Sequence, residues 1–415
     1  MTNFYVIDSI MGNGKTSAMI HLLQGAEYDS DHYVVVVPLL TEVERWKAAF
    51  DRCGLNPVAP KSGVKNKTKM ADLKELLRHH AQMIIVTHSL LDRFDTETTD
   101  LLREGNYTLV IDEVPTPVRR LEMKKGDIAA YLAAGIISVD KDTRRVSWNA
   151  DFADMETSFD DVRDLCKTGN VVYSPSAKAI YRVSSYDIYF ACKSVYILTY
   201  MFEAQIVYYY LAQRNVQYKK FSAYYDEECG YYCLCEYSPI FDKTSNWREL
   251  IRICDHKRMN AVGEKRNALS VNWFGKNPGQ CKILKKNVFN FSRNMCKAKC
   301  NDILWTTYMD YQDDIASNGF KKSFLAVNAK ATNDFSDRTV VSYIANCFVS
   351  PDIRNYFNIN DKNLKFDEDA YALSEMLQFI WRSAIRTGKP INLYIPSSRM
   401  RGLLEKWIEE NSVPA

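Results

Sequence analysis

The pattern that most constrains this chain is a short apolar segment, a glycine-containing loop and a helical segment at its start. Residues 4–8 (FYVID) are apolar and β-rich, and residues 16–23 carry apolar side chains at helical spacing. Between them stands S-I-M-G-N-G-K-T, the phosphate-binding pattern G-x-x-x-x-G-K-[ST] with Ser9 in place of the first glycine. A strand, this loop and a helix in succession are typical of the first unit of a parallel α/β sheet.

The residue types in this loop suit a nucleoside triphosphate. Glycines let backbone N–H groups curve around an anion, and the following helix adds the positive end of its dipole. We expect Lys15 to reach the β- and γ-phosphates and the Thr16 hydroxyl to ligate Mg²⁺. The predicted contacts to ATP are Gly12, Asn13, Gly14, Lys15, Thr16 and Ser17.

Four further apolar runs continue the alternation of strand and helix. They occupy residues 33–37, 83–86, 107–111 and 194–198. Runs of this kind, bounded by turns and separated by helical segments, are typical of strands buried on both faces of a parallel sheet. We therefore expect residues 1–210 to form one doubly wound α/β domain.

Two adjacent carboxylates follow the run at 107–111. At the carboxyl end of such a strand, Asp112 can hold Mg²⁺ through water, and Glu113 can orient and deprotonate an attacking water. Acidic strand-to-helix turns also occur without any catalytic role. The phosphate-binding loop in the same chain favours the catalytic interpretation.

The chain changes character after residue 210. Residues 211–300 are rich in tyrosine and then basic: fourteen Lys and Arg face three acids between 243 and 300, a net charge of +11 in a chain whose total is +3. Aromatic residues such as Trp273 and Phe289 are interleaved with these charges. The mixture suits a nucleic acid whose bases can stack, or equally a solvated face around a small core. The basic residues proposed to contact nucleic acid are Lys285, Lys286, Lys297 and Lys299.

Strand-like runs resume at residues 302–306 and 323–327, each followed by a helical segment. A second α/β domain over residues 281–415 fits this pattern. Residues 211–280 then form a linker or insertion between the two domains.

The cysteine pattern and the search for targeting segments indicate the cellular compartment in which the chain is expected. The eleven cysteines are odd in number and have no repeating spacing, which favours thiols over a disulfide framework. Cys229, Cys233 and Cys235 lie in an alternating aromatic stretch typical of a strand, and Cys296 and Cys300 have helical spacing; buried thiols are favoured over a metal site. Neither a membrane-spanning apolar window nor an export signal is evident, so we expect a cytosolic chain without a membrane partner.

These motifs resemble, in order and spacing, those of the superfamily 2 helicases and translocases, and in particular the short helicases of tailed bacteriophages. M-G-N-G-K-T is similar to motif I, and D-E-V-P at 112–115 is similar to motif II, the DExx box. Motifs Ia, Ib, III, IV, V and VI are matched by residues 38–42, 86–89, 198–202, 304–308, 328–334 and 378–386.

The resemblance implies two RecA-like doubly wound parallel-sheet domains in tandem, with the basic and aromatic segment inserted between them. It implies ATP hydrolysis, with Mg²⁺, coupled to stepping along or unwinding DNA, single-stranded or forked, in phage replication or recombination in the host cytoplasm. Two alternatives stay open: an RNA-directed motor of the same fold, and a switch-type ATP-binding initiator or loader that acts on other replication proteins.

Motif VI of the family usually reads Q-x-x-G-R-x-x-R. Here Gln378, Arg382 and Arg386 fall at i, i+4 and i+8, so we expect them along one helical face. Such a face can present two guanidinium groups to a γ-phosphate, where charge builds up in the transition state. Trp381 replaces the usual glycine, and Arg386 lies one place late.

The remaining motifs imply contacts to the nucleic-acid backbone and a coupling role. By resemblance, phosphates of the nucleic acid contact Thr41, Thr87, Thr306 and Thr332 through hydroxyl and main-chain groups. Thr199 of motif III links the nucleotide site to the nucleic-acid site, although the two residues that follow it depart from the usual Ala-Thr.

Overall fold

In the computed structural model, the chain divides into two compact units. The residues described are 2–25, 31–52, 54–63, 68–175, 177–327, 334–360 and 365–412. The first unit comprises Met1–Ser9, Gly14–Ser238 and Ser350–Lys365, and the second Ile10–Asn13, Pro239–Val349 and Phe366–Ala415. Neither unit follows the predicted boundaries: residues 211–238 belong to the first unit, and the second begins at Pro239 instead of residue 281.

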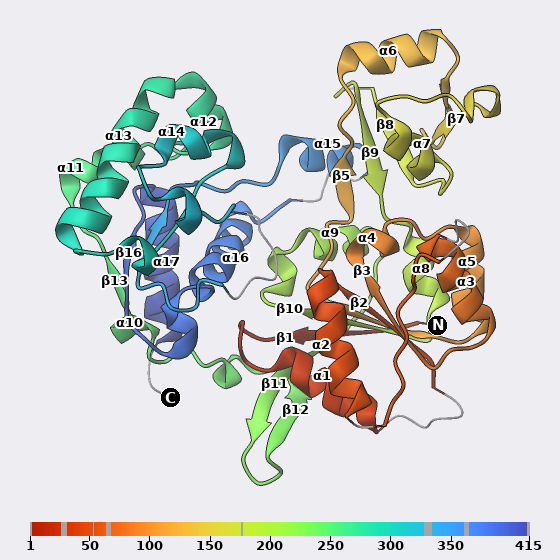
Figure 1. The fold of residues 1–415 in the computed structure, drawn as a ribbon, viewed down its shortest axis with the longest axis horizontal. Coiled ribbons are helices and arrows are strands. Elements are labelled where there is room, and N and C mark those ends of the chain that lie inside the picture. Colours follow the sequence, from red (N-terminus) through yellow and green to blue (C-terminus); the bar gives the residue numbers. More distant parts are fainter. Residues whose placement is uncertain are drawn as a thin grey trace. The chain divides into compact units, whose positions relative to one another are not determined.

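A seven-stranded sheet forms the centre of the first unit, in the order β12-β11-β1-β10-β4-β2-β3 (Figure 1). All neighbours are parallel except β11 and β12. Its strands are β1 (Asn3–Asp8), β2 (Tyr33–Val37), β3 (Met83–Thr87), β4 (Thr108–Asp112), β10 (Ser194–Thr199), β11 (Lys219–Asp226) and β12 (Tyr231–Glu236). The five strands predicted from apolar runs are confirmed, because runs such as 34–37 are fully buried between helices.

Amphipathic helices cover this sheet. The helices are α1 (Lys15–Gln24), α2 (Leu40–Asp51), α3 (Lys69–Arg78), α4 (His88–Leu91), α5 (Thr96–Glu104), α8 (Tyr186–Ala191) and α9 (Ile206–Ala212). Met19 of α1 and Trp46 and Phe50 of α2 are inaccessible to solvent and pack against sheet residues such as Val35.

A separate lobe interrupts the first unit between β4 and β10 (Figure 1). Its strands β5 (Val118–Arg120), β8 (Val171–Ser174) and β9 (Ala179–Val183) form an antiparallel sheet, beside a hairpin of β6 (Ile137–Val139) and β7 (Val146–Trp148). With α6 (Lys125–Ala133) and α7 (Asp160–Cys166), these strands enclose a core of their own. The prediction of one doubly wound domain over residues 1–210 did not include this lobe, because its short strands lack the long apolar runs on which that prediction rested.

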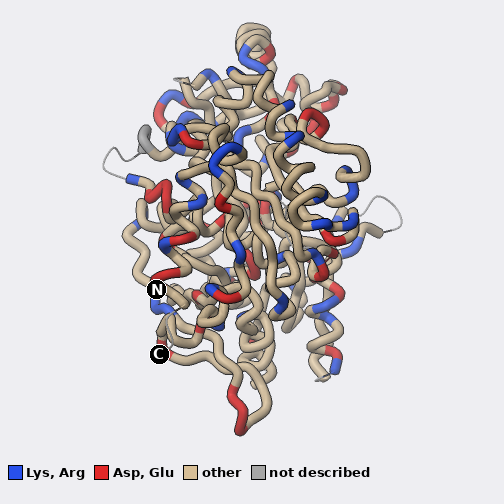
Figure 2. The backbone as a smooth tube through the Cα atoms, turned by 90° about the vertical axis from the view of Figure 1, so that its left-hand side faces the viewer, with Lys and Arg blue, Asp and Glu red and all other residues tan. Residues whose placement is uncertain are grey.

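The β11–β12 hairpin confirms the strand predicted around Cys233 and Cys235, which lie in β12. Its tip carries Asp226, Glu227 and Glu228, and Figure 2 shows this acidic stretch at the end of the hairpin. Among the residues that the structure describes, no group of three His, Cys, Asp or Glu side chains is arranged to hold a metal ion.

The second unit is built on a four-stranded parallel sheet in the order β13-β16-β15-β14. Its strands are β13 (Ile251–Ile253), β14 (Ile303–Thr306), β15 (Val340–Tyr343) and β16 (Ile391–Tyr394). Its helices include α10 (Trp247–Leu250), α11 (Lys257–Asn260), α12 (Val271–Lys276), α13 (Pro278–Phe289), α14 (Gln312–Ile315), α16 (Glu368–Trp381) and α17 (Ser398–Asn411). Because its main segment begins at Pro239, this unit takes in most of the predicted linker.

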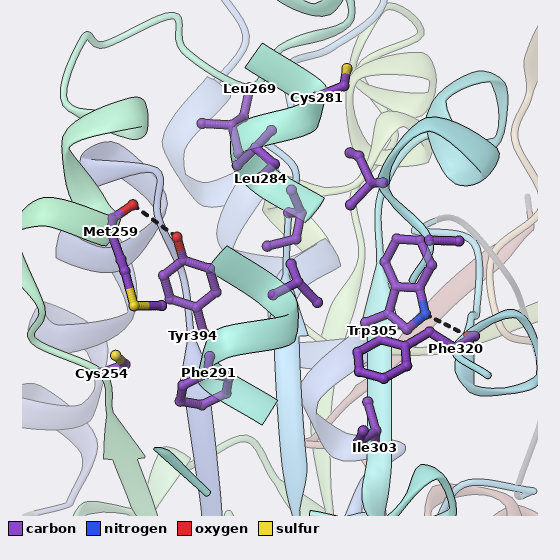
Figure 3. Close-up of a cluster of buried hydrophobic side chains, with 14 of the residues drawn as sticks. Cys254, Met259, Leu269, Cys281, Leu284, Phe291, Ile303, Trp305, Phe320 and Tyr394 are labelled. Carbon is purple, nitrogen blue, oxygen red and sulfur yellow. Dashed lines mark hydrogen bonds between the residues drawn. The ribbon is translucent and has the colours of Figure 1, made fainter. Parts of the chain in front are cut away.

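One core cluster of the second unit joins the basic stretch to the sheet (Figure 3). Tyr394 donates its hydroxyl hydrogen to the Met259 carbonyl at 2.9 Å, and the Trp305 indole N–H donates to the Phe320 carbonyl at 2.8 Å. The strand predicted at 323–327 is wrong: Phe324 makes an isolated bridge to Trp305 and packs against its ring, without forming a ladder.

Two further observations complete the fold. Helix α15 (Pro351–Asn360) belongs to the first unit, where it contacts β5 of the lobe. Within the described part of the chain, no helix is both long and apolar enough to cross a bilayer.

Arg182 of β9 joins the lobe to the edge of the large sheet. Its side chain is 2% exposed and lies 2.6 Å from the carboxylate of Asp92, which is 25% exposed. It also donates a hydrogen bond to the carbonyl of Thr116 at 3.5 Å. Asp92 ends α4 and Thr116 follows β4, so this one side chain links three segments.

We predict that Arg182→Leu lowers the free energy of unfolding by roughly 2–3 kcal/mol, because a partly buried carboxylate loses its cation. Urea unfolding measures the change. Arg182→Leu/Asp92→Leu should recover part of the loss, whereas Arg120→Leu, at an exposed position of β5, should stay within about 0.5 kcal/mol of wild type. Equal effects of Arg182→Leu and Arg120→Leu would contradict this role.

Candidate nucleotide-binding site

The loop between β1 and α1 has the backbone of an anion-binding loop. Gly12 and Gly14 adopt left-handed conformations, with φ of +80° and +83°. A Cβ on Gly14 would lie 2.0 Å from the ring of Tyr232, so the position excludes any side chain. The residue at the amino end of α1 is Gly14, which has no side chain to cap the helix, and a helix terminus of this kind suits an anionic ligand.

Ser9, in place of the first glycine, is fully buried and held on both sides. Its N–H donates to the carbonyl of Thr199 at 3.2 Å, and its hydroxyl oxygen accepts from the N–H of Ala223 at 2.9 Å. Its carbonyl accepts from the Lys15 ammonium at 2.6 Å. The substitution is tolerated because β11, which sequence analysis did not place beside β1, supplies a partner for the hydroxyl.

Residues 10–13 group with the second unit. The Ile10 N–H donates to Asp242 Oδ1 at 2.8 Å, and the Asn13 side-chain amide donates to the Phe241 carbonyl at 2.8 Å. A Cβ on Gly12 would lie 2.0 Å from the ring of Trp381. The tryptophan that replaces glycine in motif VI thus packs against a glycine of motif I.

Asp112 and Thr16 meet at the carboxyl edge of the sheet. The Thr16 hydroxyl donates to Asp112 Oδ2 at 3.0 Å, and the Trp46 indole N–H donates to the same oxygen at 3.1 Å. Burial raises the pKa of the Asp112 carboxyl, and these two hydrogen bonds oppose that rise. A hydroxyl beside a carboxylate is an oxygen donor set that fits Mg²⁺.

Glu113 follows Asp112 in a different environment. It is exposed, and its φ of +55° is in the left-handed region, where a residue other than glycine is strained. This turn of the backbone makes the two neighbouring carboxylates differ, one enclosed and one open to solvent. That difference fits a metal-holding acid followed by a base that acts on water.

Motif III is anchored by a residue that sequence analysis missed. Thr199 ends β10 and is buried, with Asp8 of β1 opposite it in register. The Asp8 carboxylate accepts from the N–H groups of Met201 at 2.8 Å and Phe202 at 3.1 Å. Met201 has a φ of +53°, so the two departures from the family pattern lie in a loop held by its backbone.

A cation completes this anchor. The Lys220 ammonium lies 3.0 Å from Asp8 and 3.1 Å from Glu203. In the sequence, the only sign of this role is that the apolar first strand ends in a charged residue, Asp8.

The four threonines proposed to contact nucleic acid lie in different environments. Thr41 is exposed in the first turn of α2, and Thr87 ends β3, so both lie at the carboxyl edge of the sheet. Thr306 is fully buried, which is incompatible with the predicted contact between its hydroxyl and a phosphate. Thr332 lies outside the described residues.

Motif VI does not form the predicted single helical face. Helix α16 ends at Trp381, and the chain turns at Ser383 before a 3₁₀ turn, Ala384–Thr387, that contains Arg386. Gln378 is half-buried, Arg382 is 9% exposed and Arg386 is exposed. The Ala384 N–H donates to the Arg338 carbonyl at 2.9 Å, a tertiary contact that favours the turn over helix continuation.

The basic stretch presents charges on a structured surface. On α13, Cys281, Leu284 and Val288 are buried while Lys286 is exposed and Lys285 half-buried. Lys297 and Lys299 are exposed. Most of the interleaved aromatics belong to the core, among them Trp247, Phe274 and Phe291, whereas Phe289 is 42% exposed and Trp273 is half-buried.

Comparison with known proteins defines the class first. The model of the type III restriction enzyme res subunit matches residues 2–116. The structure of S. tokodaii Xpd4 superimposes with a TM-score of 0.52 at 10% identity, covering 98% of this chain and 94% of that one. The tandem RecA-like fold is thereby confirmed, and the chain resembles superfamily 2 helicases in fold.

The family follows from a relative along the whole length. The SPbeta prophage-derived uncharacterized protein YonV of Bacillus subtilis (strain 168) is 35% identical over 418 residues, 99% of each chain. The YonV middle domain matches residues 118–181, which form the lobe, and the YonV C-terminal Rossmann-like domain matches residues 245–408. The chain belongs to the YonV family.

We predict that Gly14→Ala destabilises the protein and weakens ATP binding. The left-handed backbone alone costs roughly 1–2 kcal/mol for alanine, and the Tyr232 ring adds a steric cost. Urea unfolding and binding of a fluorescent ATP analogue measure the two effects. In a cycle with Tyr232→Ala, only the steric part should be relieved.

Gly126→Ala is the matched control, because that glycine lies in α6 with nothing within 4 Å of the added Cβ. It should be neutral or slightly stabilising. Wild-type ATP affinity in Gly14→Ala would contradict the assignment of the loop.

Proposed function

We propose that this chain is an ATP-dependent nucleic-acid translocase or helicase that acts on DNA. The observation that carries the proposal is the contact of Thr16, on the phosphate-binding loop, with Asp112, next to the exposed Glu113. These three groups lie at the carboxyl edge of a parallel sheet, where α/β proteins bind nucleotides.

Each motif residue of the first unit has a proposed task in phosphoryl transfer. The N–H groups of the loop and the Lys15 ammonium would bind the triphosphate, and Thr16 and Asp112 would hold Mg²⁺. Bound Mg²⁺ would supply neutralisation of the charge on the β- and γ-phosphates. Glu113, open to solvent, orients a water molecule and takes its proton.

Motif VI, in the second unit, supplies the remaining catalytic residues of the proposal. Arg382 and Arg386 are proposed to neutralise charge on the γ-phosphate in the transition state, and Gln378 is proposed as a further catalytic residue of the same motif. Arg386 is the exposed guanidinium of the two, and Arg382 is enclosed at the end of α16. The different burial suggests direct contact for Arg386 and a positioning role for Arg382.

Coupling to nucleic acid is proposed to run through the ends of neighbouring strands. Thr41 and Thr87 follow β2 and β3, which pair in parallel beside β4, so they share an edge with Asp112. Thr199 bonds Ser9 of the phosphate-binding loop through its carbonyl, which makes motif III sensitive to that loop. The prophage origin in the name of the Bacillus relative supports a role in phage replication or recombination.

We predict that Lys15→Ala and Glu113→Gln separate binding from hydrolysis. Lys15→Ala should weaken ATP binding and abolish turnover, whereas Glu113→Gln should bind Mg²⁺–ATP but lose turnover by roughly 10² or more, because the base is removed and the metal site is kept. ATP hydrolysis is measured alone and with single-stranded, duplex and forked DNA and with RNA.

The same set of hydrolysis measurements decides between a DNA motor, an RNA motor and a switch-type protein. Stimulation by DNA in the wild-type protein supports the proposal, and preferential stimulation by RNA assigns an RNA motor. Slow hydrolysis whose rate is unchanged by any of the nucleic acids assigns a switch-type initiator or loader. Wild-type turnover in Glu113→Gln would overturn the role given to motif II.

The basic surface of the second unit gives another prediction. Replacing Lys285, Lys286, Lys297 and Lys299 with Ala should weaken DNA binding and make the slope of log K against log salt shallower by about 0.7–0.9 for each phosphate that the protein no longer neutralises. Fluorescence anisotropy of labelled DNA in rising salt measures both quantities. Lys389→Ala/Lys406→Ala, two exposed positions outside this stretch, should keep the wild-type slope. An unchanged slope in the four-lysine variant would remove this surface from the DNA path.

A further inference from the structure

A cavity of about 290 Å³ lies where the lobe meets the helices of the first unit, away from the phosphate-binding loop. Four parts of the chain contribute to it: the β6–β7 turn, β8 and β9, the region of α8 and α9, and α15. The side chains that define its chemistry are Arg144, Arg145, Tyr173, Tyr186, Arg214 and Tyr356. A cavity of this size is at the lower end for a small-ligand site, which suits one nucleotide unit.

The cavity is positively charged. Arg144, Arg145 and Arg214 are all exposed, and the acid in the lining is Asp187. Its carboxylate accepts a hydrogen bond from the Ser185 hydroxyl at 3.3 Å. Three guanidinium groups against one carboxylate favour an anion, and guanidinium groups match phosphate geometry.

The basic groups are pre-arranged by local structure. Arg144 has a φ of +58° in the β6–β7 turn, and its N–H donates to the Asp140 carbonyl at 2.9 Å. Its carbonyl accepts from the Tyr173 N–H of β8 at 2.9 Å, which fastens the turn to the neighbouring strand. An ordered turn loses less conformational entropy on binding than a mobile one.

Arg214 is held by aromatic stacking. Its guanidinium carbon lies 4.6 Å from the centre of the Tyr186 ring, and that ring stacks on the ring of Tyr210, with their centres 4.0 Å apart. The Tyr186 hydroxyl donates toward the carbonyl of Tyr210 at 2.9 Å. Because Tyr186 is held in this way, its contact with Arg214 restricts the guanidinium, which is part of the cavity lining. Tyr173 is half-buried: it packs against the core of the lobe and also lines the cavity, where its ring can stack on a base.

We propose that this cavity binds one nucleotide unit of single-stranded nucleic acid, with the three arginines on the phosphates and Tyr173 against a base. The inference rests on the proposed function, which makes nucleic acid the substrate. It goes beyond that function by assigning a contact to the lobe, which lies between motifs II and III and carries none of the helicase motifs.

The test measures anisotropy of a fluorescein-labelled dT20 strand with the full chain in rising salt. Arg144→Gln/Arg145→Gln should weaken binding at least several-fold and make the log–log salt slope shallower by about 0.7 for each phosphate that is no longer neutralised. Arg214→Gln should act in the same direction. Tyr173→Leu should weaken binding by about 5-fold or more with an unchanged slope, because removal of a stacking ring involves no counterion release.

Lys124→Ala/Lys125→Ala is the matched control, because both lysines are exposed on the same lobe but outside the cavity. It should bind as the wild type does. Basal ATP hydrolysis should be unchanged in the variants, and the urea midpoint should be unchanged in the arginine variants, whose side chains are exposed. If Arg144→Gln/Arg145→Gln unfolds, Arg214→Gln and Tyr173→Leu decide.

Three results would overturn the inference. Wild-type affinity and slope in the cavity variants would do so and leave the proposed function standing, as long as the wild-type chain binds dT20. An equal loss of affinity in the lysine control would show general attraction to charge instead of a site. A wild-type chain that binds no nucleic acid would overturn the proposed function, and this inference with it.

Discussion

The enclosed carboxylate of Asp112 is the constraint on which the site depends. An isolated carboxylate buried away from water costs several kcal/mol, so it persists only where hydrogen bonds and nearby cations offset the loss of hydration. Here the Thr16 hydroxyl and the Trp46 indole donate to it, and Lys15 and Arg45 add favourable charge. Strand β4 fixes its position, because β4 pairs in parallel with β2 and β10.

That arrangement explains which parts of the fold could be predicted from sequence. Strands such as β2 and β4 are buried on both faces, so their apolar runs are unambiguous. The backbone at residues 12 and 14 is left-handed, a conformation that favours glycine, so the loop also leaves a clear pattern in the sequence. Contacts between distant segments left no comparable trace. The indole of Trp46 and the carboxylate of Asp8 act at the site through tertiary contacts that neither local pattern nor motif spacing reveals.

The predictions that were wrong failed for the same reason, because tertiary contacts and short strands leave little local pattern in the sequence. Periodicity predicted one helical face for Arg382 and Arg386, yet a tertiary hydrogen bond from Ala384 to Arg338 accompanies a turn between them. The short strands of the lobe, three to five residues each, give no strong apolar signal. Interleaved aromatics suggested stacking platforms, but burial of Trp247 and Phe291 shows that most of them build the core.

The most direct test of the central claim is ATP-dependent displacement of a labelled strand from forked DNA, followed with wild-type protein and with Lys15→Ala. The account predicts displacement by the wild type only when Mg²⁺ and ATP are both present, and none by Lys15→Ala. DNA-stimulated ATP hydrolysis without displacement would restrict the activity to translocation. Neither displacement nor stimulated hydrolysis, in a folded protein that binds ATP, would contradict the assignment of a motor.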